Sequence, residues 1–174
     1  MTKPGTSRSA PVQVSEKRLS VVHVTMTTAT AYAQVAGFIE SHLGRFTDHI
    51  RELAEEHRTA QLRAELVRIA GRYGLALHYT AGHGQLLQLE GAERPVVTYH
   101  IGNVLLAEQM TKVDFAAGLY APLRVVIYGN DQGGTTLEYD KPSSLFGQFH
   151  DPGIDAVAAT LDTRLDTLLR AAAT

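Results

Sequence analysis

Between residues 78 and 128 this chain carries histidine, arginine and tyrosine side chains suited to acid–base chemistry. Alternation along short β-branched runs puts His78 and His100 on polar faces of two expected strands, while Arg124 and Tyr128 share a face of a third. Imidazoles titrate near neutral pH, and a guanidinium can hold an anion or an enolate. If these faces coincide, the sequence predicts a small-molecule site whose catalytic groups are His78, His100, Arg124 and Tyr128.

Four more residues are predicted to line this site. Glu138 lies on the polar face of its strand, where a carboxylate can orient a histidine. His83 stands between two glycines, where backbone amides can approach a ligand closely. Tyr99 and Tyr139 belong to a group of tyrosines that suits either an aromatic wall or the core. The predicted binding residues are therefore His83, Tyr99, Glu138 and Tyr139.

The leading hypothesis is a cofactor-independent enzyme, such as a biosynthetic cyclase or isomerase, acting on a small metabolite. Two alternatives stay open. An antiparallel sheet normally has one wet face, so the same residues are compatible with a non-catalytic, homodimeric binding or interaction module. Because His78, His83 and His100 fall in one expected meander, a haem or metal carrier is the third hypothesis, although no HExxH or Cys/His motif supports it.

Composition argues against several other classes. The chain has no cysteine, which excludes disulfides, thiolate metal ligands and cysteine nucleophiles. No GxSxG motif is present. A formal net charge of −2 argues against a nucleic-acid partner. Apolar runs are far shorter than the roughly 20 residues that cross a bilayer, so we expect no membrane partner and a cytoplasmic location.

The N-terminal half is expected to be mainly helical. Residues 1–17 read as a disordered arm, and residues 18–27 as a first strand rich in β-branched residues. Thr28 and Thr30 can cap a long helix that is kinked at Gly44. Its second stretch runs from Asp48 through residue 72 and ends at Gly74.

The C-terminal half is expected to be mainly strands. The runs LALHYT, QLLQL and VVTYHI predict a three-strand meander, and PLRVVIY and TTLEYD predict a hairpin. Asn103 opens a short helix between them, and Asp151 followed by proline begins a final amphipathic helix. The predicted fold is a single α+β domain over residues 18–174, with an antiparallel sheet of about six strands and the helices packed on one face.

Residues 99–149 resemble the domain-of-unknown-function 302 family. The similarity is carried by Gly102 and Asn103 at a helix start, by the run APLRV that begins at residue 121, and by Tyr139 followed by the Pro-Ser-Ser that begins at residue 142. The resemblance extends from His83 to about residue 169, and one departure is Val104, where the family usually has proline. It implies a TATA-binding-protein-like fold and a bacterial homodimer, and it implies no established activity.

Overall fold

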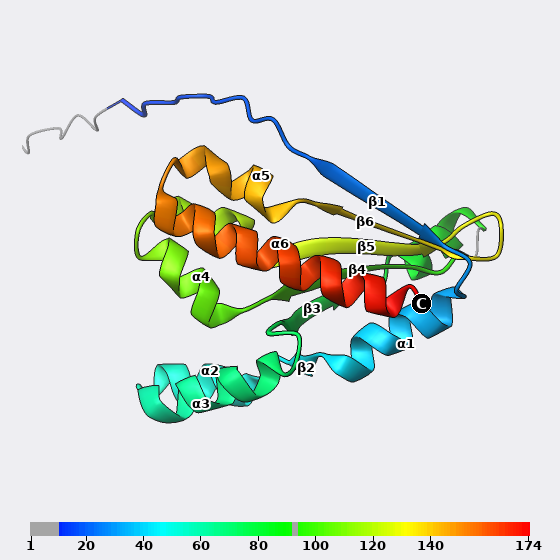
Figure 1. Ribbon diagram of the computed structural model, residues 1–174, viewed down its shortest axis with the longest axis horizontal. Coiled ribbons are helices and arrows are strands. Elements are labelled where there is room, and N and C mark those ends of the chain that lie inside the picture. Colours follow the sequence, from blue (N-terminus) through cyan, green and yellow to red (C-terminus); the bar gives the residue numbers. More distant parts are fainter. Residues whose placement is uncertain (1–10, 92–93) are drawn as a thin grey trace, which may run out of the picture.

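The alternating runs of the C-terminal half form the centre of a six-stranded sheet, as Figure 1 shows for the computed structural model, which describes residues 11–91 and 94–174. Neighbouring strands are antiparallel except for β2 and β3, which are parallel. Across the sheet the order is β1 (His23–Thr28), β6 (Thr135–Asp140), β5 (Leu123–Gly129), β4 (Val96–Gly102), β3 (Ala76–Ala81) and β2 (Gly44–Arg45).

Helices cover one face of this sheet. The longest, α6 (Pro152–Ala172), lies along that face, with α1 (Tyr32–His42) near its C-terminal end and α4 (Val104–Thr111) near its N-terminal end (Figure 1). The Asp151 carboxylate caps α6 by accepting hydrogen bonds from the amides of Gly153 (2.8 Å) and Ile154 (3.0 Å), as the sequence predicts. The predicted apolar stripe of α6 is buried, which confirms an amphipathic helix packed on a sheet.

Alternate residues of the central strands form the core. On the helix-covered face, Tyr99 and Ile101 of β4, Val125 and Ile127 of β5 and Leu137 of β6 are fully buried. A second, smaller cluster lies where α2 (Asp48–Glu55) and α3 (Thr59–Ala70) pack against Ala76 at the start of β3. Since side chains alternate along a strand, the residues between the buried ones point to the opposite face, which we call the open face.

The prediction of a long, kinked N-terminal helix is wrong. Residues 32–70 form three short helices, α1, α2 and α3, and the two-residue strand β2 lies between α1 and α2. The break occurs at Gly44, where a Cβ atom would lie 2.4 Å from the Ile69 carbonyl oxygen. Only glycine lets β2 pass α3 this closely, so the helix ends and the chain joins the sheet beside β3.

The prediction that Thr28 and Thr30 cap the first helix is wrong, and both residues have a different role. Ala31 occupies the N-cap position of α1, and no side chain caps it. Both threonine hydroxyls instead donate to the Ala173 carbonyl oxygen, at 2.7 and 2.8 Å, and so tie the end of α6 to the end of β1. The first strand begins at His23 rather than at residue 18, and residues 11–22 form neither helix nor strand; residues 1–10 of the predicted arm lie outside the described part.

A further strand prediction, QLLQL, is wrong. This segment belongs to the 3₁₀ helix η1 (His83–Glu90). Because β3 pairs directly with β4 on one side and with β2 on the other, no position in the sheet is left for the segment that connects them. The connection closes instead as tight helical turns.

The predicted start of α4 is confirmed. The Asn103 side chain accepts a hydrogen bond from the Leu106 amide at 3.1 Å and donates one to the Gly74 carbonyl oxygen at 2.8 Å. One residue thus caps α4 and fixes the turn that leads into β3.

Replacing this residue, as Asn103→Ala, should lower the free energy of unfolding by about 1–2 kcal/mol, because it removes the cap and one of the two donors to the Gly74 carbonyl oxygen, the other being Arg164. Urea unfolding followed by circular dichroism measures the change. The control Glu108→Ala, on the exposed surface of the same helix, should stay within about 0.5 kcal/mol of the parent protein. Equal stabilities of the two variants would contradict this role of Asn103.

Candidate functional site

The sheet register brings polar side chains together on the open face. Residues directly opposite one another on neighbouring strands point to the same side, so His100 of β4 and Arg124 of β5 form one pair. In the same way Glu138 of β6 stands opposite Val126 of β5, and Tyr128 lies two residues further along β5. The structure therefore brings together four of the predicted residues: His100, Arg124, Tyr128 and Glu138.

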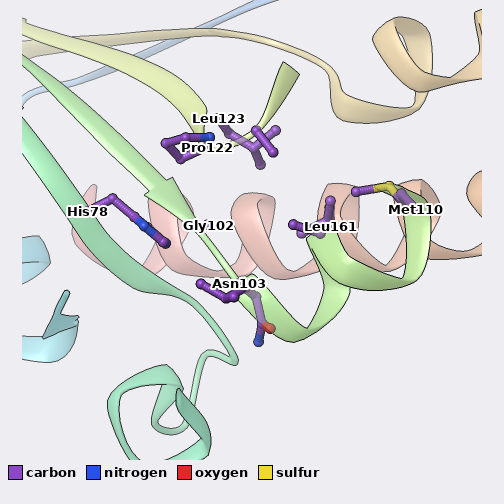
Figure 2. Close-up of a pocket in the computed structure, with 10 residues that line it drawn as sticks. His78, Gly102, Asn103, Met110, Pro122, Leu123 and Leu161 are labelled. Carbon is purple, nitrogen blue, oxygen red and sulfur yellow. The ribbon is translucent and has the colours of Figure 1, made fainter. Parts of the chain in front are cut away.

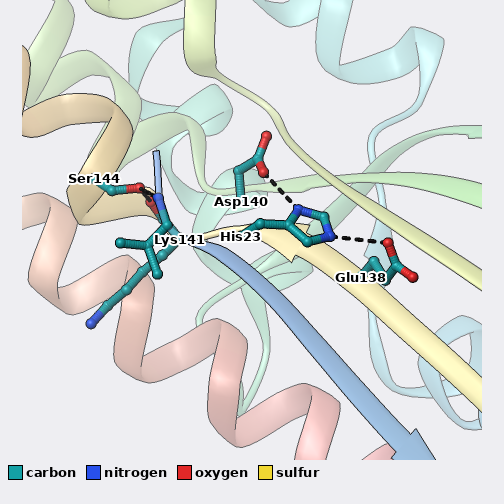
Figure 3. Close-up of polar contacts among 6 residues, drawn as sticks. His23, Glu138, Asp140, Lys141 and Ser144 are labelled. Carbon is teal, nitrogen blue, oxygen red and sulfur yellow. Dashed lines mark hydrogen bonds and ion pairs between the residues drawn. The ribbon is translucent and has the colours of Figure 1, made fainter. Parts of the chain in front are cut away.

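His23 of β1 joins two carboxylates on this face (Figure 3). Its Nδ1 lies 3.0 Å from Asp140 Oδ1 and its Nε2 lies 3.0 Å from Glu138 Oε2. The hydrogen bond to Asp140, followed by that to Glu138, raises the pKa of His23 above its ordinary value. An imidazolium donates from both nitrogens, which is the form that two carboxylates select.

Tyr128 extends this chain of polar contacts. Its hydroxyl donates to Glu138 Oε1, so the two oxygens of one carboxylate are bound by Tyr128 and by His23. The hydrogen bond raises the pKa of Tyr128, while the bonds from Tyr128 and His23 lower the pKa of Glu138. The result is a neutral phenol and an ionised carboxylate, both held in fixed positions near neutral pH.

His100 has the opposite electrostatic environment. Partial burial, and then the positive charge of Arg124, lower its pKa below the ordinary value. The ring of Tyr79 meets the His100 ring edge-on, with 5.5 Å between centroids, and Tyr79 itself is 63% exposed. Near neutral pH His100 is therefore a neutral imidazole beside an arginine, able to accept a proton.

These residues surround an open groove of about 500 Å³. Its polar lining includes His83 at the start of η1 together with His23, His100, Arg124, Glu138 and Asp140, while Tyr128 contacts Glu138 and is not itself part of the lining. This volume falls in the range of about 300–1,000 Å³ that small-molecule sites occupy. The groove combines the positive charge of Arg124 and the neutral imidazole of His100 on one side with the carboxylates of Glu138 and Asp140 on the other.

His78 does not face this groove. A bulge in β3 puts both His78 and Tyr79 opposite a single residue of β4, His100, so the alternation that the sequence suggests is broken at this point. The His78 ring stacks on Phe46 at 5.1 Å and lines a separate cavity. Beyond the bulge Thr80 pairs with the buried Tyr99, whereas unbroken alternation would put Thr80 on the same face as His78.

The two predicted binding tyrosines lie in the core. Tyr99 is fully buried and donates its hydroxyl to Glu40 Oε1 of α1 at 2.6 Å. Tyr139 is buried in the core cluster on the helix-covered face, and burial raises the pKa of both phenols. The structure therefore separates Tyr99 from the groove on the open face described above, whereas Tyr139 belongs both to the core cluster and to the lining of that groove.

The histidines considered as metal or haem ligands do not gather. His78 lines one cavity, whereas His83 and His100 line the groove. Within residues 11–91 and 94–174, no three His, Asp or Glu side chains are arranged to share a metal ion. Among the helices of the same described ranges, none combines the length and the apolar character that a bilayer crossing needs.

The sequence analysis missed His23 and Asp140. Both lie in segments that were expected to be strands, but their contact depends on the pairing of β1 with β6, across 117 residues of chain. The only signal in the sequence was an alternation of polar and apolar residues, His23, Thr25 and Thr27 with Val24 and Met26. This pattern predicts that His23 lies on the polar face of its strand, but it does not predict which residues His23 contacts.

The titration of His23 tests the proposed charge pattern. Its pKa, measured from histidine ring resonances by NMR, should lie above about 6.5 in the parent protein and fall in Asp140→Asn, the larger contributor, and less in Glu138→Gln. A histidine whose pKa is raised by folding stabilises the folded state fully at pH values below its pKa in the unfolded chain. This stabilisation is lost as the pH rises through its pKa in the folded protein. The stability difference between parent and His23→Gln should therefore shrink from pH 5.5 to pH 8.5. A His23 pKa at or below 6.5 would contradict the contact pattern.

Comparison with known proteins agrees with this architecture. No curated protein matches the chain. Among solved structures, the chain is similar to the "Crystal structure of uncharacterized conserved protein DUF302 from Bacillus stearothermophilus", with a TM-score of 0.60 and 20% identity over 87% of this chain and 98% of that one. The family model "Domain of unknown function DUF302" matches residues 51–172, which extends the resemblance back to α2. The chain belongs to the DUF302 family.

Proposed function

We propose that the open face binds a small anionic or carbonyl-bearing metabolite and acts on it as a cofactor-independent acid–base catalyst. The observation that carries this proposal is the pairing of His100 with Arg124 across β4 and β5, beside the groove. The roles of His100, Arg124, Tyr128, Glu138 and His83 at this site follow from that pairing and from the contacts described above.

Arg124 supplies the binding group. Its side chain is exposed, and within residues 11–91 and 94–174 no carboxylate oxygen lies within 4 Å of its nitrogens. A guanidinium that is not engaged by an internal partner is available for a carboxylate, a phosphate or an enolate oxygen. The neighbouring carboxylates Glu138 and Asp140 are held by His23, so they form a wall that orients a polar ligand.

His100 supplies the base. A neutral imidazole can take a proton from a carbon next to a carbonyl group while Arg124 stabilises the negative charge that develops on the carbonyl oxygen. Return of that proton to a different carbon gives an isomer. Attack of the carbanion on a second carbonyl group of the same molecule, with return of the proton from His100 to the new alkoxide, gives a ring. Neither outcome needs an oxidant or a cofactor, which is why we favour isomerase or cyclase chemistry.

A second candidate is a non-catalytic, homodimeric interaction module, since the family resemblance implies a homodimer and a TATA-binding-protein-like fold. A cytoplasmic location is proposed for either candidate. Phe115 and Leu119, on the 3₁₀ helix η2 (Phe115–Tyr120), are 90% and 78% exposed. Two large apolar side chains on one short element are typical of a contact surface.

Binding is tested by screening a library of small carboxylic and oxo acids with ligand-observed NMR. Ligands of the groove should lose about 10-fold or more in affinity in Arg124→Ala, because charge-assisted hydrogen bonds contribute about 1.5–3 kcal/mol. Arg63→Ala removes the same charge from an exposed position on α3 and should leave binding unchanged. A library without any ligand that depends on Arg124 would contradict the proposal.

Catalysis is tested by incubating such a ligand with the protein in D₂O and following carbon-bound protons by NMR. The parent protein should exchange one proton for deuterium or convert the ligand, and the rate should fall as pH drops below the lowered pKa of His100. His100→Gln should retain binding and lose exchange by about 100-fold or more. Exchange that survives in His100→Gln would remove this residue as the base, while binding without exchange would leave only the binding role.

A further inference from the structure

A second, smaller cavity lies at the end of the sheet, between the strands and α4. Its volume is about 180 Å³, and its walls are mainly apolar (Figure 2). It shares no lining residue with the open-face groove. The residues that shape it come from β3, β4, β5, α4, α6 and the segment before β5: His78, Gly102, Met110, Pro122, Leu123 and Leu161.

The space exists because residue 102 is glycine. A Cβ atom at this position would lie 3.3 Å from Pro122 Cβ and 3.5 Å from His78 Nε2. Any larger side chain at Gly102 would therefore extend into the space beside Pro122 and His78, where the cavity is found. The bulge in β3 supplies the other condition, because it directs His78 here while Tyr79 lies beside His100.

His78 is the polar group of this cavity. Its Nε2 atom is buried and has no hydrogen-bond partner among the described residues, although buried polar atoms in folded proteins are nearly always paired. Burial lowers the pKa of His78, the backbone of Gly102 opposes this shift and His100 adds to it, so that the net effect favours a neutral ring. A ligand that matches an unpaired ring nitrogen in an apolar wall therefore needs one hydrogen-bonding group and an otherwise apolar surface.

We propose that this cavity binds a compact, neutral, ring-sized molecule with one hydroxyl group, such as a small phenol, whose hydroxyl pairs with His78 Nε2. The size agrees with this class, since an apolar cavity of about 150 Å³ inside a protein accommodates benzene. A hydroxyl can donate or accept, so it satisfies either tautomer of the neutral imidazole. Charged ligands are excluded because no charged side chain lines the cavity.

The test uses phenol as the probe and toluene as the matched molecule that lacks the hydroxyl. Titration of the full-length protein, labelled with ¹³C in histidine and methyl groups, should shift the His78 ring together with the methyl groups of Leu123 and Leu161. Phenol should bind about 2- to 12-fold more tightly than toluene, the range expected for one net hydrogen bond.

Two variants separate the contributions of the nitrogen and of the space. His78→Phe preserves the stacking on Phe46 and removes Nε2, so the preference for phenol over toluene should disappear. Ala107→Leu adds bulk from α4 at the cavity wall and should weaken both probes by 10-fold or more. Arg124→Ala should change neither affinity, which separates this site from the open-face groove.

Circular dichroism checks that each variant is folded. If His78→Phe is unfolded, Ala107→Leu and the pattern of shifts in the parent protein decide whether phenol binds in this cavity. The proposal is overturned if phenol fails to shift the His78 ring at concentrations of about 50 mM, the weak end expected for a ligand of so few atoms. It is also overturned if the shifts lie elsewhere, if Ala107→Leu binds phenol normally, or if a folded His78→Phe retains the preference for phenol.

Discussion

The burial of only one face of the sheet is the constraint on which the rest of this structure depends. The central strands place fully buried residues such as Ile101, Val125 and Leu137 under α1, α4 and α6. Since alternate side chains must then point the other way, a slip of one residue in any strand would expose this core. The pairing of His100 with Arg124, and of His23 with Glu138 and Asp140, is therefore enforced by the same register that buries the apolar residues.

The charges on the open face are arranged in two groups with different consequences. Around His23, each polar group has a partner: both ring nitrogens lie 3.0 Å from carboxylate oxygens, and Tyr128 binds the second oxygen of Glu138. At His100, partial burial and then the neighbouring charge of Arg124 disfavour a second positive charge, which leaves a neutral base next to a cation. The first group is satisfied internally, so the second is where a ligand gains the most from binding.

The elements that the sequence could predict are those whose signals are local. The caps at Asn103 and Asp151 and the apolar stripe of α6 need only neighbouring residues, and the hairpin of β5 and β6 needs only a short turn. Gly44 was recognised as a break, but its cause, the close passage of β2 beside Ile69, requires the folded chain. The same holds for QLLQL, whose apolar content fits a strand until the sheet leaves it no neighbour.

For the site, the alternation of side chains along a strand predicted the face of a residue correctly where the strand is regular. It failed where the strand is irregular. It placed His100, Arg124, Tyr128 and Glu138 on one face, and it failed for His78 because a bulge adds one residue without any mark in the sequence. It also could not identify His23, which reaches Asp140 only through the pairing of the first and last strands of the chain. Long-range strand pairing is the information that one sequence does not carry.

The central claim is that the open face is a ligand-binding surface, and a crystal structure of the protein purified directly from cells without ligand removal tests it most directly. The account predicts electron density of a small molecule in the groove, in contact with Arg124 and within hydrogen-bond distance of His100. A second copy of the chain packed over the open face, with Arg124 and His100 buried against it, would contradict the claim and favour the interaction module.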